Sequence, residues 1–502
     1  MRVTVSLRSA YSALSGSTSD ILPFYMMTAA SGVVARVVPV IGIVASYLIL
    51  SSQGRIDEFE SEIEGFDTST LVSDGELNQT AADSLTQTFS VLVTPESAAV
   101  LGLSLVAGVV LFAFVNSVVS AAKINAAYGV LTSSESPVED GLRGGASDYL
   151  SLFFLFCLEA GLELLLVFVF GGLVSLLPTP AALLIVPVWL VSSLGVHLLF
   201  VFAPQAVVVD SADAVGALRK NLGFVTSAPV ETAVYLIVAV VVYSVVFGLS
   251  ALLSLVSATT VATLVVMLGA VPFLDITKTS LYSGETYSRE TSVVGVERSA
   301  STRLLDSVRD GLSETAVFVR SYPLLVSVSL GVFGVGVVNG LDATAGIEVV
   351  MEPPEESSRV FRNPVGTFFE ISANNWLVGF SQTFSGLAVG VPTLVSLWYN
   401  GAVIGGILGV RLGSTAPLGF TSLVALLAPH GVLEIPALGV TGGLGLRLGR
   451  EVWRTLRGRA SIEELADEIT TAYSILVGLL VVFVLASAVE SFVTPVVYSV
   501  VS

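Results

Sequence analysis

The side chains best suited to chemistry are His430 and Glu434, which stand inside an apolar stretch at 417–446. Residues four apart share one face of a helix, so the imidazole and the carboxylate are expected to be neighbours. Pro429 and Gly431 weaken the helical hydrogen bonds beside them. Because ionisable groups inside a membrane are costly and need partners, the pair predicts one of two things. It is either a substrate, ion or proton site, or a hydrogen-bonded lock between helices.

We predict the partners of this pair from the depth of each residue in the membrane. Counting about 1.5 Å of rise per residue puts Asn400 at a similar depth, which predicts an intramembrane polar cluster with His430 and Glu434. The same count groups Asn374, Asn375 and Glu490 nearer the outer end of the bundle. A zinc site normally needs three protein ligands, and the only other histidine lies in the other half of the chain. We therefore expect no metal and no cofactor.

A second polar cluster is expected in the amino-terminal half. Glu159 and Glu163 are four residues apart, and depth counting places Arg36 and His197 near the same level. One arginine can neutralise only one of the two carboxylates, so the other would need a proton. Proton-coupled carriers use such an arrangement. The alternative is a neutralised charge pair that fixes helix packing.

Composition sets the class of protein. The chain is 53% hydrophobic and only 12% charged, well below the usual quarter of charged residues in soluble domains, so we expect a multi-pass protein of the cell membrane with the lipid bilayer as its partner. Its 40 acidic and 22 basic residues give a formal net charge of −18, with only three lysines. This acidic composition suggests a halophilic archaeon and argues against binding to nucleic acid. The single cysteine, Cys157, cannot form an internal disulfide.

The expected fold is all-α, a polytopic transmembrane helical bundle of about eleven helices arranged as six plus five. Crossing a bilayer takes roughly 20 apolar residues. The first six such spans are 21–50, 97–122, 149–177, 181–208, 229–255 and 258–277. The other five are 323–339, two passes within 368–412 joined by a turn at Gly390, then 417–446 and 469–492.

Loop charges predict the orientation. The loops at 53–96 and 342–362 are acidic, whereas those at 278–320 and 447–459 carry most of the arginines. The positive-inside rule places the basic loops in the cytoplasm, with the N-terminus inside and the C-terminus outside. The predicted domains are a six-helix membrane domain at 1–283, a cytoplasmic linker at 284–321 and a five-helix membrane domain at 322–502.

Several different short motifs lie in the last third of the chain. They are Asn374-Asn375, Tyr399-Asn400-Gly401 with Gly405, Pro429-His430-Gly431 through Glu434-Ile435-Pro436-Ala437, Gly445-Leu446-Arg447-Leu448-Gly449, and Glu490 with Thr494-Pro495. With these motifs the region at about 322–495 resembles the stage II sporulation protein M family of integral membrane proteins. In spore formers, the resemblance implies a protein that organises cell-wall hydrolases during engulfment without chemistry of its own. Relatives in other organisms are thought to work near AAA+ ATPase systems, which the resemblance implies as a partner.

We therefore expect a non-enzymatic scaffold that organises a membrane or cell-envelope complex, with protein partners docking at 278–320 and 447–459. The alternative is a transporter or lipid translocator that uses the buried polar residues. An intramembrane hydrolase has less support, because no serine or cysteine nucleophile is placed beside His430 and three metal ligands are not found in the sequence.

Overall fold

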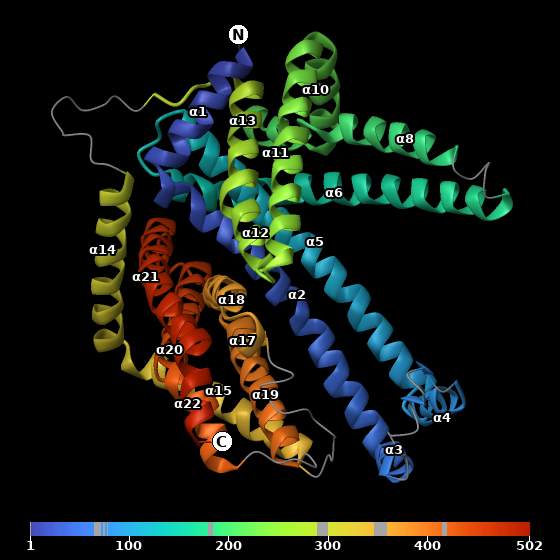
Figure 1. Cartoon of the computed structure of the whole chain (residues 1–502). Coiled ribbons are helices and arrows are strands. Elements are labelled where there is room, and N and C mark those ends of the chain that lie inside the picture. The colour runs from blue at the N-terminus through green and yellow to red at the C-terminus, as the bar shows by residue number, and fades with distance from the viewer. Residues whose placement is uncertain are drawn as a thin grey trace. The chain divides into compact units, whose positions relative to one another are not determined.

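Helices make up nearly all of the described chain, which the computed structural model gives for residues 2–64, 72–73, 76–77, 79–178, 184–288, 300–345, 359–413 and 419–501 (Figure 1). Ten helical segments in this part of the chain are long and apolar enough to cross a membrane. The all-α, multi-pass character predicted from composition is therefore confirmed. A total of eleven passes and the orientation stay predictions.

The amino-terminal half contains most of the separate elements. In chain order these are α1 (Arg2–Gly16), α2 (Thr18–Ser52), α3 (Arg55–Glu64), β1 (Val72–Ser73), β2 (Glu76–Leu77), α4 (Gln79–Ser90), α5 (Pro95–Leu131), α6 (Pro137–Leu176), α8 (Ile185–Phe200), α9 (Ala203–Asp210), α10 (Ala214–Ser227), α11 (Pro229–Leu255), α12 (Thr259–Val265), the π-helical turn η2 (Val266–Ala270) and α13 (Val271–Ser283).

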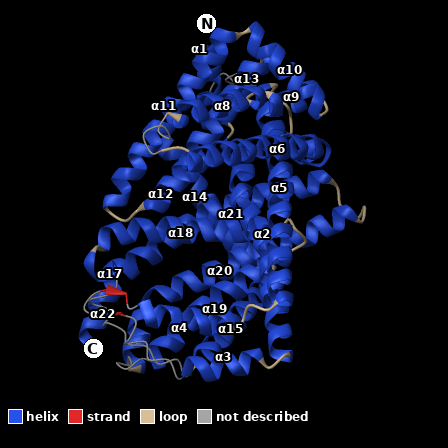
Figure 2. Ribbon diagram, turned by 90° about the vertical axis from the view of Figure 1, so that its right-hand side faces the viewer, coloured by secondary structure: helices blue, strands red, loops and turns tan. Residues whose placement is uncertain are grey.

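The carboxyl-terminal half has fewer elements, all of them helical in the described residues and drawn blue in Figure 2. They are α14 (Ala300–Ser321), α15 (Pro323–Thr344), α17 (Arg359–Arg362), α18 (Pro364–Ser385), α19 (Val391–Gly413), α20 (Phe420–Leu456), α21 (Ile462–Ala488), the π-helical turn η3 (Val489–Val493) and α22 (Thr494–Val501). Residues 346–358, which are most of the acidic loop predicted at 342–362, lie outside the described residues.

Contacts divide the chain into two units, one of Val34–Val115 and one of Met1–Val33 with Asn116–Ser502. This is a different division from the predicted boundary at 284–321, which stays a prediction. In the smaller unit the Ser46 hydroxyl donates to the Ser97 carbonyl (3.4 Å), and the rings of Phe59 and Phe89 lie 5.4 Å apart. The two strands there form one antiparallel pair.

An aromatic cluster stabilises the amino-terminal part of the larger unit. The ring of Phe202 lies 4.6 Å from that of Phe224 and 5.7 Å from that of Tyr235. The Asn221 amide crosslinks the same region, since it accepts from the backbone N–H of Phe202 at 2.8 Å and donates to the carbonyls of Leu198 and Leu199. Because this asparagine is fully buried, its three bonds satisfy a polar group that would otherwise be costly.

Close backbone contact joins α15 and α19. A Cβ atom at Gly336 would meet the Trp398 carbonyl oxygen, and one at Gly340 would meet that of Ala402. Gly401 approaches the backbone of α15 in the same way. Membrane helices associate through small residues that let their backbones meet, so these glycines set the distance between the two helices.

The amphipathic helix α14 lies along α21 in Figure 1 and packs against it. Their closest point is at Gly311 and Gly478, where a Cβ on either residue would collide with the backbone of the other helix. Most of the segment predicted as a linker is therefore a helix of the bundle. Residues 289–299 of that segment lie outside the described part.

Helix α18 explains the difference between ten candidate passes and the eleven expected. It has 22 residues but carries many polar side chains, so it falls outside the ten apolar segments. A turn separates α18 from α19 and ends at Gly390, whose φ of +79° favours glycine. Two helices thus occupy 368–412, as the sequence predicts.

Candidate functional site

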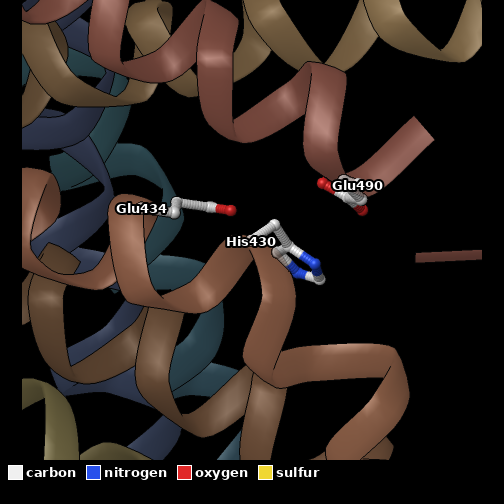
Figure 3. Close-up of side chains that lie close together, drawn as sticks. All are labelled: His430, Glu434 and Glu490. Atoms are coloured by element: carbon white, nitrogen blue, oxygen red, sulfur yellow. The ribbon is translucent and has the colours of Figure 1, made fainter. Parts of the chain in front are cut away.

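Three ionisable side chains meet between α20 and the last helical segment. His430 and Glu434 are one turn apart on α20, and Glu490 reaches them from η3 (Figure 3). One donor atom from each residue lies within 4.8 Å of the others. All three residues are half-buried. The structure therefore adds a third ionisable group to the pair seen in the sequence.

The imidazole in this cluster lacks a protein partner. His430 Nδ1 is buried, and no hydrogen bond reaches it within the described parts of the chain. Among the same residues, neither Glu434 nor Glu490 forms a salt bridge. Two carboxylates at this separation repel each other unless a proton or a cation lies between them. The cluster is thus suited to hold such a species.

A π-helical turn places Glu490 in the cluster. The N–H of Thr494 bonds to the Val489 carbonyl, five residues back, instead of four. The cause is Pro495, which has no N–H and whose ring crowds the carbonyl four residues earlier. Such turns are rare and often mark functional positions.

The predicted group of Glu490 with Asn374 and Asn375 stays a prediction. The Trp376 indole, next to Asn375, donates to the Leu476 carbonyl at 2.8 Å. Leu476 lies fourteen residues before Glu490 in the sequence, which is about 21 Å of helix. Asn374 is exposed, and Asn375 is buried with an Nδ2 that has no partner in the described chain.

Asn400 has its contact elsewhere. Its Nδ2 lies 3.5 Å from Ser396 Oγ on the same helix, and within the described residues no hydrogen bond joins it to His430 or Glu434. Depth alone does not fix the direction in which a side chain leaves its helix. The predicted cluster of these three residues stays a prediction.

A different polar network joins the helices around the cluster. The Gln382 amide donates to the Leu438 carbonyl and to Thr441 Oγ1, both at 3.0 Å, and Thr383 donates to the Thr441 carbonyl. Thr393 on α19 donates to the Gln382 carbonyl at 2.9 Å. These buried bonds link α18, α19 and α20. This network was not predicted from the sequence, because the short side chains of these threonines are common in membrane helices and gave no distinctive pattern.

Comparison with known proteins finds similarity in this carboxyl-terminal region. Residues 324–495 match the family Stage II sporulation protein M. An uncharacterized protein of Methanocaldococcus jannaschii is 22% identical over 173 residues, which cover 34% of this chain and 94% of that protein. No solved structure matches the chain. The His430, Glu434 and Glu490 cluster and the polar network both lie inside the segment that matches Stage II sporulation protein M.

The predicted amino-terminal cluster lies outside the Stage II sporulation protein M match. His197 Nδ1 is 3.6 Å from Glu159 Oε1, and the Ser193 hydroxyl lies 2.9 Å and 3.0 Å from the two oxygens of Glu163. These contacts join α6 to α8. Arg36 belongs to the other unit, and its contact with the carboxylates stays a prediction.

A cavity of about 350 Å³ in the same half was not predicted. Its lining is almost entirely apolar surface and includes Val266 and Met267 of the other π-helical turn, and the polar residues that contribute to it are Tyr25, Thr28, Lys123 and Thr263. The Lys123 ammonium lies 5.3 Å from the centre of the Tyr25 ring. Thr28 Oγ1 is buried, with no partner in the described chain. The one feature of the sequence that could have indicated this cavity is Lys123, a rare lysine inside an apolar helix.

Proposed function

We propose that this protein is a non-enzymatic scaffold of the cell membrane, with one docking surface built from the linker helix α14 and residues 447–459. The sequence predicts these residues as a basic loop, and we call them the arginine loop, but in the structure they are the end of α20 and the turn that follows it. The observation that carries the proposal is the position of Arg447. Its guanidinium lies 4.3 Å from the centre of the Tyr322 ring and pairs with Glu468. The end of α14, the loop and the start of α21 are thereby held together, which supports a single surface.

Three arginines of this surface are available to an acidic partner. Arg454 pairs with Glu451 at 2.8 Å, whereas Arg450, Arg457 and Arg459 are exposed. Exposed arginines attract acidic surfaces and fix the orientation of docking. We propose a cytoplasmic protein as the partner, and an AAA+ ATPase system is the class implied by the family resemblance.

Photo-crosslinking tests the scaffold. A crosslinking amino acid at Arg320 and one at Arg459 should capture the same protein in intact cells, and Arg457→Glu should reduce both products several-fold. A crosslinker at Val241, an exposed residue of the apolar helix α11, and the variant Arg219→Glu serve as controls. Capture of unrelated proteins at the two sites would contradict a single docking surface.

The cavity at Lys123 favours a second candidate, a translocator of anionic amphiphiles. A volume of about 350 Å³ lies within the range of small-molecule sites. Asp275 accepts a hydrogen bond from Tyr25 at 3.2 Å, and Asp275 and Lys278 are the charged neighbours of Lys123. Two ammonium groups with one carboxylate leave one positive charge, which an anionic headgroup would compensate, while the apolar wall would contact a chain.

Proteoliposomes distinguish the two functions. A translocator should move fluorescent phosphatidylglycerol across the membrane faster than protein-free vesicles do, and Lys123→Met should abolish the difference while Lys220→Met at the surface should not. Equal rates with and without protein would exclude this candidate and leave the scaffold unaffected.

A further inference from the structure

We propose that His430, Glu434 and Glu490 bind a divalent transition-metal cation between α20 and the last helical segment. The proposal rests on their geometry, because one donor atom from each lies within 4.8 Å of the other two. Figure 3 shows the three side chains close together. Donors bound to one zinc ion at about 2.0–2.2 Å lie roughly 3.4 Å apart in a tetrahedral site. Small side-chain rotations would therefore complete the coordination.

The state of the imidazole independently indicates a ligand. His430 Nδ1 is buried and has no hydrogen-bond partner in the described parts of the chain. Buried polar atoms of native proteins nearly always have a partner, and an exception calls for an explanation such as an ion. A cation would supply that partner and would also neutralise the two carboxylates.

A purely structural role explains the cluster less well. The helices around it are already joined by the Gln382 and Thr441 bonds, and the cluster contributes no hydrogen bond of its own in the described chain. A lock normally satisfies its polar groups. In addition, the π-helical turn at η3 costs regular hydrogen bonding, and its effect is to bring Glu490 to the pair.

The donor set selects the class of metal. One imidazole nitrogen with two carboxylate oxygens is suited to zinc and its first-row neighbours. Calcium and magnesium prefer oxygen ligands alone. The sequence argued against zinc because only two ligands were evident, and Glu490 now supplies the third. Three protein ligands leave a further position for water.

Metal analysis of the full-length chain tests the site. Protein purified in detergent is treated with EDTA, incubated with zinc chloride, passed through a desalting column and analysed for zinc. We expect about one zinc ion per chain, and at least a tenfold loss in His430→Gln, Glu434→Gln and Glu490→Gln. Zinc should also raise the melting temperature of the parent but not of Glu490→Gln.

Matched controls exclude zinc bound loosely by the acidic surface. Glu163→Gln removes another half-buried intramembrane carboxylate, and His197→Gln removes the second of the two histidines. Both should retain about one zinc. Gel filtration and circular dichroism establish that each variant is folded.

Two results would overturn the site. One is a parent protein that binds no zinc, cobalt or manganese above background. The other is a folded Glu434→Gln, Glu490→Gln double variant that binds as much as the parent. The scaffold proposal does not depend on either result, because its docking surface lies at the arginine loop and not at this cluster.

Discussion

Replacing Gly336 by alanine tests whether α15 and α19 meet backbone to backbone. The new Cβ would collide with the Trp398 carbonyl oxygen and lie 3.0 Å from the Ala402 nitrogen. Both are backbone atoms, so no side chain can rotate away and the helices must separate. Overpacking of this kind typically costs about 1–3 kcal/mol.

The same helix contains a matched control. A methyl group added at Gly334 would meet nothing within 4 Å, so Gly334→Ala brings only the gain in helix propensity, which is about 1 kcal/mol. Gly336→Ala also gains this helix propensity. The difference between the two variants therefore isolates the close approach, and we expect Gly336→Ala to be less stable than Gly334→Ala by about 1–3 kcal/mol.

Unfolding by titration with SDS in mixed micelles, followed by circular dichroism, measures this difference. Equal free energies of unfolding for the two variants would refute the inference that the glycines set the distance between α15 and α19. If both variants were less stable than the parent by the same free energy of unfolding, the cause would be a general intolerance of α15 to substitution.

Three further predictions concern orientation, packing and the π-helical turn. In a cysteine-free background, an impermeant maleimide should label Ser61→Cys in intact cells and spare Arg459→Cys, and the reverse pattern would contradict the predicted orientation. Trp376→Phe removes the hydrogen bond to the Leu476 carbonyl and should lower the free energy of unfolding by at least about 0.6 kcal/mol, the mean for interhelical bonds, in the same SDS titration. Pro495→Ala restores an N–H to the helix. It should weaken zinc binding by about tenfold or more, because residues that orient metal ligands affect the affinity by this amount. Unchanged zinc affinity would show that Pro495 does not position Glu490.

The membrane helices could be predicted because their signal is local. Span 229–255 coincides with α11, and most other spans differ only where polar helix ends extend beyond the apolar stretch, as at Pro137 of α6 and Leu456 of α20. The length of an apolar stretch does not indicate how far its helix continues into polar sequence.

The candidate site could be predicted only in part, for a related reason. His430 and Glu434 are neighbours within one helix, so their spacing is sufficient. Glu490 lies 56 residues beyond Glu434 in the sequence, and its approach depends on a proline-induced π-helical turn and on the pairing of two helices. The inclusion of Asn400, which rests on depth alone, stays a prediction.

The packing of α14 on α21 bears on where the carboxyl-terminal module begins. The family match starts at residue 324, after α14 has ended. A fragment cut at that point would lose Gly311 and Phe318, and the faces of Gly478 and Gly443 that they cover would be open. The smallest piece of this chain expected to fold as the intact protein does therefore starts before Ala300, and a fragment designed from family boundaries alone is expected to aggregate through the uncovered side of α21.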